Sequence, residues 1–263
     1  MKILVFIKQV ADTEARILIK SDKKSLEIEN KYNMNFFDEF AVEEAIKIKE
    51  KSKETTVAVC TYGPKRAVEA LRTAIAMGVD QAFLLENNNL NGDDPLITAK
   101  ILAGFAKQEG FDFILCGRQA IDDESSNIGV MVAEFLGIPH VSSIMKLDII
   151  DEKKALVESE IEGGRETIEV QLPALFTVQK GMNEPRVPLI TGVMKAMKAN
   201  IPFIDPYSLG LTREMIDTCA AKTNVLCYEA PQERPPVRII EGNTPEEKVK
   251  GLITILKEEA KVL

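Results

Sequence analysis

The stretch FDFILCGRQAIDDESSNIGVMVAEFLG, residues 111–137, contains a strand, a loop and a helix in direct succession. The apolar run at 111–117 is typical of a strand that is covered on both faces. After the loop, apolar residues recur at i, i+3, i+4, i+7 and i+8, which predicts a helix with one apolar face. These residues are Ile128, Met131, Val132, Phe135 and Leu136. The stretch therefore predicts one strand–helix unit of an α/β protein.

The first 140 residues repeat this alternation of strand and helix. Continuous apolar runs predict strands at 3–8, 55–62 and 81–86. Helical spacing and end signals predict helices over 38–50 and 64–78, and a third that starts at Pro95 with Asp94 as its N-cap. Repeated units of this kind predict a doubly wound, mostly parallel α/β sheet of the Rossmann-like type. Such sheets bind ligands beyond the carboxyl ends of their strands, which is where the loop at 117–129 is expected.

Beyond this helix the pattern changes to strand-like segments with short turns. The tripeptide EGG at 162–164 is a hairpin signal. Residues 200–242 are rich in proline and lack periodicity, which indicates an extended arm without a core of its own. The chain then closes with a predicted helix that Thr244 caps and that Pro245 begins.

Charge and hydropathy argue against two classes of partner. The net charge is −8 and the pI is near 5.0, so a basic face for nucleic acid is not expected. No run of 18 apolar residues is present, so no membrane span is expected. The cysteines form no C-x-x-C pair, and their apolar surroundings predict reduced, buried thiols in a cytoplasmic protein. They are Cys60, Cys116, Cys219 and Cys227.

The single histidine, His140, limits the catalytic chemistry that this chain could perform. A two-histidine metal motif is impossible, and a Ser-His-Asp triad would rest wholly on this residue. Because His140 follows a helix in the segment GIPHVSS, we expect it to be a structural or surface residue. We therefore assign no catalytic residue and no metal site from the sequence.

The loop GRQAIDDESSNIG, residues 117–129, combines an acidic cluster with small polar residues that open a helix. A metal site would need several converging oxygens, which the adjacent residues 122–124 cannot supply by themselves. A phosphate site is better supported physically, because the N–H groups and the dipole of the first helical turn favour an anion. A serine-capped helix with acids in its first turn is the competing interpretation, and the residues alone leave both open. The glycine fingerprints of dinucleotide and P-loop sites are both absent.

An ordered series of segments carries a family resemblance. The chain begins with MKILVFIKQVAD, and MNFFDEFAVEEAIKIKE, RTAIAMGVD and GRQAIDDES follow in that order. Then come VESEIEGGRETIEVQLPALFTV at 157–178 and NEPRVPLITGVMKAMK at 183–198. In these segments the chain resembles the β subunit of electron transfer flavoproteins over nearly its full length.

Two positions depart from the pattern of that family. Phe36 stands where the family usually has proline, which leaves the loop before the helix at 38–50 less rigid. Bifurcating relatives read close to D-G-D-T-A-Q-V-G in the phosphate loop, whereas residues 122–129 read D-D-E-S-S-N-I-G. The second departure favours AMP over FAD in this chain.

The resemblance implies a heterodimeric electron carrier. The redox FAD would lie mainly on an α subunit, and this chain would hold a structural AMP. The carrier would shuttle electrons between a flavin dehydrogenase, acyl-CoA dehydrogenase-like or other, and another redox partner such as a quinone oxidoreductase. It would turn over no substrate of its own. In the bifurcating alternative this chain holds a second FAD that reacts with NAD(H). Outside the family, a stand-alone adenine-nucleotide-binding module is a further alternative.

The resemblance also implies roles for individual residues. Those expected to bind the nucleotide are Phe6, Asn35, Phe36, Phe37, Asp38, Tyr62, Ser126, Asn127, Ile128, Gly129 and Val132. Those expected near the flavin of the α subunit are Thr13, Phe37 and Glu160. Those expected to recognise a partner dehydrogenase are Leu189, Ile190, Met194 and Lys195.

The expected domain organisation follows from the same resemblance. An α/β nucleotide-binding domain over 1–199 would include a recognition loop at 183–198, and the arm and helix over 200–263 would pack on the α subunit. In the recognition loop, an exposed aliphatic anchor at Ile190 would enter an apolar pocket of the partner. The competing interpretation is that Ile190 and its neighbours at i+3 and i+4 form an ordinary core face.

Overall fold

The computed structural model describes residues 1–52, 54–87, 94–234 and 236–263, and it divides into two compact units, Met1–Cys227 and Tyr228–Leu263. The strands of its main sheet are β1 (Lys2–Phe6), β6 (Thr56–Gly63), β7 (Gln81–Glu86), β8 (Phe113–Gly117), β9 (His140–Asp151), β10 (Lys154–Ile161), β11 (Gly164–Gln171), β12 (Ala174–Val178) and β13 (Phe203–Ile204). The short strands are β2 (Gln9–Ala11), β3 (Ile17–Ile19), β4 (Leu26–Ile28) and β5 (Tyr32–Met34). The helices are α1 (Phe36–Lys51), α2 (Val68–Met77), α3 (Pro95–Glu109), α4 (Ile128–Leu136), α5 (Ile190–Lys198), α6 (Arg213–Ile216) and α7 (Pro245–Glu258).

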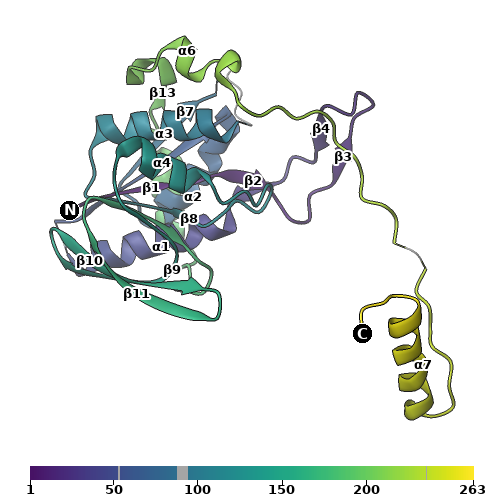
Figure 1. Ribbon diagram of the computed structural model, residues 1–263. Coiled ribbons are helices and arrows are strands. Elements are labelled where there is room, and N and C mark those ends of the chain that lie inside the picture. Colours follow the sequence, from purple (N-terminus) through teal and green to yellow (C-terminus); the bar gives the residue numbers. More distant parts are fainter. Residues whose placement is uncertain (53, 88–93, 235) are drawn as a thin grey trace. The chain divides into compact units, whose positions relative to one another are not determined.

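Within the described residues, nine strands form one sheet in the order β11-β10-β9-β12-β8-β1-β6-β7-β13 (Figure 1). The strands from β12 to β13 in this order run parallel, so their carboxyl ends share one edge. Strand β9 is parallel to β12 and continues into the antiparallel strands β10 and β11. The predicted doubly wound, mostly parallel α/β sheet is therefore confirmed.

The chain reverses its direction of travel across the sheet at β1. From β1 it passes to β6 and β7 on one side, and it then returns to β8 on the other side of β1. Along β1 the side chains alternate: Ile3 and Val5 pack with α1 and α2, whereas Leu4 and Phe6 pack with α3 and α4. Figure 1 shows α3 and α4 on the opposite side of the sheet from α1. The carboxyl ends of β1 and β8 thus form the topological switch point at which α/β sheets bind ligands.

The predicted helix start signals are present in the structure. Helix α3 begins at Pro95, and the Asp94 carboxylate accepts the N–H of Ile97 at 3.0 Å, as a capping residue does. Helix α7 begins in the same way, with the Thr244 hydroxyl accepting the N–H of Glu247 at 3.3 Å. Both helices therefore begin where the cap and the following proline indicate.

The structure differs from the sequence expectation in two places. Residues 9–34 form two small antiparallel pairs, β2 with β5 and β3 with β4, which the sequence pattern did not predict. Cys60 and Cys116 are buried as expected, but Cys219 and Cys227 are exposed. The expectation of buried thiols is wrong for these two residues because they lie in a 3-10 turn and in irregular chain, not in strands.

His140 begins β9 and is exposed, which agrees with the expected surface histidine. In the part of the chain that the structure describes, no helix is both long and apolar enough to cross a membrane.

The proline-rich segment does not behave uniformly along its length. Phe203 and Ile204 pair with Leu84 and Leu85 of β7, and Ile216 is fully buried. The beginning of this segment therefore belongs to the first unit. The second unit contains α7 and the irregular chain before it, whose Val237 and Ile239 are exposed.

Candidate functional site

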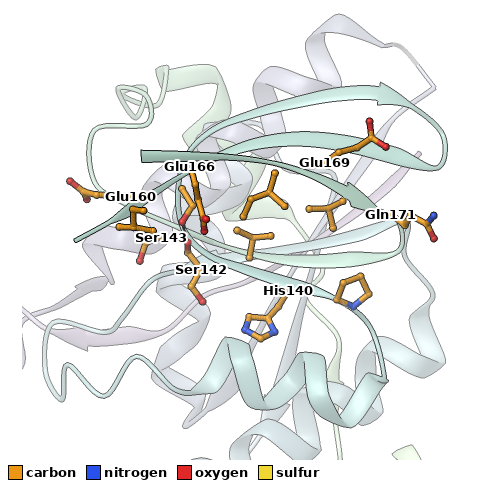
Figure 2. A pocket seen from close by; sticks show the side chains of 13 residues that line it. His140, Ser142, Ser143, Glu160, Glu166, Glu169 and Gln171 are labelled. Atoms are coloured by element: carbon orange, nitrogen blue, oxygen red, sulfur yellow. Dashed lines mark hydrogen bonds between the residues drawn. The ribbon is translucent and has the colours of Figure 1, made fainter. Parts of the chain in front are cut away.

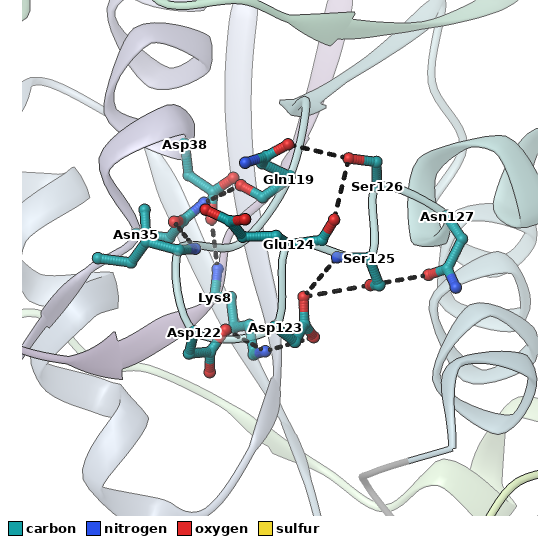
Figure 3. A network of polar contacts seen from close by, with 11 residues as sticks. Lys8, Asn35, Asp38, Gln119, Asp122, Asp123, Glu124, Ser125, Ser126 and Asn127 are labelled. Atoms are coloured by element: carbon teal, nitrogen blue, oxygen red, sulfur yellow. Dashed lines mark hydrogen bonds and ion pairs between the residues drawn. The ribbon is translucent and has the colours of Figure 1, made fainter. Parts of the chain in front are cut away.

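The switch point is organised by two buried polar residues at the start of α1. Asp38 is 5% exposed, and its carboxylate accepts the N–H of Lys8 at 2.7 Å and that of Gly117 at 2.9 Å (Figure 3). A Cβ at Gly117 would overlap this carboxylate, so the close approach requires glycine there. Burial raises the pKa of Asp38 to about 7, against the two N–H bonds, which lower it.

Asn35 completes the connection between these loops. Its side-chain Nδ2 donates to the Gln119 carbonyl at 2.9 Å, and its Oδ1 accepts the N–H of Ile121 at 3.1 Å. Its own N–H donates to the Lys8 carbonyl at 2.8 Å. Asn35 and Asp38 together hold the loop after β1, the loop after β8 and the start of α1 in one arrangement. The sequence resemblance placed both residues at the nucleotide, and the structure places them beneath the loops that border the switch point.

The acidic residues of the 117–129 loop face a lysine. The Lys8 ammonium lies 2.7 Å from Asp122 and 3.1 Å from Asp123 (Figure 3). Burial lowers the pKa of Lys8, but the hydrogen bonds and charges of these two carboxylates outweigh it, so the net shift raises the pKa. Among the described residues, no group of three or more His, Cys, Asp or Glu side chains could hold a metal ion. Lys8 thus pairs with two of the three loop acids, and Asp123 also accepts the N–H of Ser125 at 3.0 Å.

The start of α4 lacks a side-chain cap. Asn127 occupies the N-cap position, but its side chain makes no capping hydrogen bond, and no acidic residue lies in the first turn. The neighbouring hydroxyls are engaged elsewhere: Ser126 Oγ donates to Gln119 Oε1 and Ser125 Oγ donates to Asn127 Oδ1, both at 3.1 Å. The interpretation of a serine-capped helix with acids in its first turn is therefore wrong. The N–H groups of the first turn and the positive end of the helix dipole face the loop.

The remaining residues expected at the nucleotide lie around this helix start or in the core beneath it. Phe6 ends β1 and is buried, and Tyr62 lies near the end of the adjacent strand β6. Val132 is fully buried on the same face of the sheet as Phe6. A Cβ at Gly129 would lie 2.8 Å from the Cys116 sulfur. Phe6, Gly129 and Val132 thus serve helix–sheet packing, whereas Ser126, Asn127 and Ile128 remain at the loop.

Phe36 and Thr13 border a pocket of about 270 Å³ between the β2–β5 pair and α2. The Phe36 ring packs edge-on against Phe37 and Phe40, and the Lys180 ammonium lies 5.3 Å from its centroid. These contacts hold Phe36 at the start of α1. Phe36 and Phe37 therefore lie beside the switch point, and Thr13 is exposed at the rim of the pocket.

Glu160 lies on the antiparallel part of the sheet, near the β10–β11 turn. Its carboxylate accepts a hydrogen bond from Gln179 Nε2 at 3.0 Å. Lys180, which follows Gln179 in the chain, places its ammonium over the Phe36 ring. Glu160 also lines an open hollow of about 730 Å³ on strands β9–β11 (Figure 2). His140 lies at the other end of this hollow. The hollow is separate from the start of α4, and the structure does not bring Glu160 next to the predicted phosphate site.

The segment expected to recognise a dehydrogenase is exposed. Leu189, Ile190 and Met194 are 75%, 81% and 54% exposed, and Lys195 is exposed on the same helix, α5. The competing interpretation, in which Ile190 and its helical neighbours form a core face, is wrong, because Val193 is 42% exposed as well.

Several residues of this region were not predicted from the sequence. Lys8 and Gln119 organise the loops at the switch point, and Arg186 pairs with Glu43 of α1 at 2.8 Å. A signal for the last pair was present, because Glu43 lies among apolar residues in the segment AVEEA. A glutamate at a core-facing position needs a partner, but the sequence does not say which basic residue supplies it.

Comparison with known families gives a match over most of the chain. The family model described as "Electron transfer flavoprotein domain" matches residues 25–208. These residues include α1, the loop at 117–129 and α5.

Individual relatives are similar from end to end. "Electron transfer flavoprotein subunit beta" of Bacillus subtilis (strain 168) is 36% identical over 264 residues, which cover 100% of both chains. The Homo sapiens protein of the same name is 34% identical over 100% of this chain and 99% of its own length. "Caffeyl-CoA reductase-Etf complex subunit CarD" of Acetobacterium woodii is 36% identical over 98% of this chain and 99% of its own.

Proposed function

The chain belongs to the electron transfer flavoprotein β-subunit family, and we propose that it holds a structural AMP whose phosphate lies at the start of α4. Membership in this family implies electron transfer, association with flavin and an α subunit as partner. In the proposed heterodimer the redox FAD lies mainly on the α subunit. This chain supplies the fixed α/β base and the adenine-nucleotide site.

One observation carries the phosphate assignment. Helix α4 starts at the switch point of the sheet without a side-chain cap and without an acidic residue in its first turn. Two of the loop acids that could repel an anion, Asp122 and Asp123, are paired with Lys8. A helix start that has neither a side-chain cap nor an acidic residue in its first turn is suited to bind phosphate. We therefore assign the phosphate to the backbone of residues 126–129, with Asn35 and Asp38 holding the bordering loops.

A charge change at Asn127 tests this assignment. Aspartate is as good an N-cap as asparagine, so the Asn127→Asp heterodimer should fold. Its carboxylate would lie where the phosphate is proposed and would lower nucleotide content several-fold. The matched control is Asn127→Ser, a neutral capping residue that should retain the nucleotide. Wild-type nucleotide content in a folded Asn127→Asp heterodimer would contradict the assignment.

The second candidate is a β subunit that holds a second FAD and reacts with NAD(H). The subunit of the Acetobacterium woodii caffeyl-CoA reductase-Etf complex is as similar to this chain as the Bacillus subtilis protein, so sequence identity does not separate a plain carrier from a subunit of a reductase complex. Anaerobic addition of NADH separates the two: reduction of a second flavin would support this candidate, and an unchanged flavin spectrum would support AMP. Family membership leaves the stand-alone nucleotide-binding module without support.

We propose separate contacts of this chain with the α subunit and with a dehydrogenase. Thr13, Phe37 and Glu160 lie near the flavin carried by the α subunit, and residues 200–263 pack on that subunit. Leu189, Ile190, Met194 and Lys195 recognise a flavin dehydrogenase, and electrons leave to a second redox partner such as a quinone oxidoreductase. The exposed state of Leu189, Ile190 and Met194 supports this docking role, since exposed aliphatic anchors contribute strongly on burial. A cytoplasmic location is part of the same proposal.

A further inference from the structure

Helix α5 is short and exposes most of its apolar side chains. It has nine residues, of which Ala196 is buried, whereas Ile190, Met194 and Met197 are exposed. A helix of this length is not stable by itself in water. Because it buries little of its own surface, contacts outside the helix must set its position.

Arg186 makes the strongest of these contacts, just before the helix. Its guanidinium lies 2.8 Å from Glu43 and 2.6 Å from Glu50, and donates two hydrogen bonds to each carboxylate. Its backbone N–H donates to Glu43 as well, at 3.1 Å. The carboxylates of Glu50 and Glu43 raise the pKa of Arg186 above its ordinary value. Such forked pairs fix direction as well as distance, so residue 186 is fixed on α1.

A second contact supports the first from the same helix. Asn183 Nδ2 donates to the carbonyl of Phe40 and to Glu44 Oε2, both at 3.0 Å. Glu43 and Glu44 are 4% and 6% exposed although they are charged residues. Buried carboxylates are costly unless they are paired. Their pairing with residues 183 and 186 means that α1 is built to hold the segment that leads into α5.

The far side of α5 is held against α2. A Cβ at Gly192 would overlap the carbonyl oxygen of Ala76, so the two helices approach as closely as glycine permits. Arg72 Nη1 donates to the Met197 carbonyl at 3.1 Å, near the end of α5. Helix α5 is therefore fixed at both ends, while its apolar face stays exposed.

We propose that Arg186, acting through Glu43 and Glu50, is a positioning residue that holds the apolar face of α5 ready for docking of the dehydrogenase. The inference rests on the proposed docking role of Leu189, Ile190 and Met194. A segment already held in its bound arrangement loses less conformational freedom on docking. Arg186 itself need not touch the partner.

The test requires a variant that does not leave a buried charge unpaired. Arg186→Gln alone would strand the Glu43 carboxylate and could unfold the chain. The double variant Glu43→Gln/Arg186→Gln removes both charges together, and Arg186→Lys keeps the charge without the fork. The matched control is Lys2→Gln/Glu109→Gln, which removes a 2.6 Å ion pair between the start of β1 and the end of α3. All variants are made in the heterodimer with the α subunit.

Two readouts are measured: hydrogen exchange of the α5 amides, and steady-state electron transfer from a purified acyl-CoA dehydrogenase that reduces the wild-type heterodimer. In the double variant we expect faster exchange in α5 and a KM for the carrier raised about tenfold. The kcat should stay within about twofold, because loosening α5 alters docking and not transfer in the docked complex. The KM of Arg186→Lys should lie between that of the double variant and that of the wild type. The KM of the control pair should equal that of the wild type.

An Ile190→Ala heterodimer separates failure of this inference from failure of the proposed function. If Ile190→Ala raises the KM but the double variant leaves it at the wild-type value, Arg186 does not position the docking face. Unchanged exchange in α5 of the double variant would overturn the inference in the same way. If Ile190→Ala also leaves the KM unchanged, α5 is not the docking segment and the inference falls with that assignment.

Discussion

At the scale of single residues, this site depends on two positions whose roles come from their close neighbours. Gly129 allows α4 to approach the sheet, and Asp38 holds two loops by their backbone N–H groups. The sequence marked both positions through the family resemblance, but it assigned them to the nucleotide. The structure adds contacts of both residues within the protein, which spacing along the chain cannot reveal.

Adding a Cβ at Gly129 should destabilise the fold. It would lie 2.8 Å from the Cys116 sulfur and 2.9 Å from a Thr177 methyl, so Gly129→Ala should lower the free energy of unfolding by about 1–3 kcal/mol. Gly164→Ala is the matched control, because a Cβ there meets nothing within 4 Å. Urea unfolding of both variants measures the difference. Equal midpoints would show that α4 can move away from the sheet without cost.

Asp38 should give stability a characteristic pH dependence. Its pKa is about 7 in the folded chain, against 3.8 for the ordinary group. Between these values the folded chain binds a proton that the unfolded chain has released, so this group makes stability fall as pH rises. The slope is at most about 1.4 kcal/mol per pH unit.

Unfolding of Asp38→Asn between pH 4 and pH 7 measures this contribution, because the variant lacks the titrating group. It should be less stable than the wild type at pH 4, since one N–H acceptor is lost, and this difference in stability should narrow as the pH rises to 7. Asp148→Asn, an exposed position on β9, controls for the loss of a charge. Parallel stability curves for wild type and Asp38→Asn would show that Asp38 does not titrate in this window.

At the scale of elements, the helices with strong periodicity and clear end signals were predictable, and the small strands were not. Helices α3, α4 and α7 begin where proline, capping residues and apolar spacing indicated. The β3–β4 pair has three residues in each strand, and its Ile17 and Leu18 are exposed. Strands that bury no face show no alternation of apolar and polar residues, so the sequence carries little signal for them.

The cap of α3 also fixes a distant segment, which gives a prediction at this scale. The Asp94 carboxylate accepts the N–H groups of Ile97, Lys222 and Thr223. Asp94→Ala removes the cap and leaves the other two donors without their acceptor, at a cost of about 2–4 kcal/mol. Proteases should then cut near residue 222 more readily. Asp94→Asn retains one acceptor oxygen, so its resistance to proteases should lie between that of the wild type and that of Asp94→Ala. Wild-type resistance in Asp94→Ala would contradict this link.

In the molecule as a whole, the alternation of strands and helices predicted the fold class. For the site it predicted the edge of the sheet but not the contacts between side chains. Periodicity predicted the parallel sheet and the edge at which a ligand is expected. It could not reveal the pairing of Arg186 with Glu43, which lie 143 positions apart. Nor could it show that Lys8 pairs with Asp122 and Asp123, because Lys8 lies on a different strand–loop unit. Such contacts depend on the strand order and not on spacing.

We propose above all that this chain contributes an AMP site to a flavin-carrying heterodimer. The most direct measurement is to purify the heterodimer, denature it and quantify the released nucleotides by chromatography. We expect one FAD and one AMP for each heterodimer. Two FAD without AMP would contradict it in favour of the NAD(H)-reactive form, and a single FAD with no second adenine nucleotide would contradict the assignment of a nucleotide site to this chain.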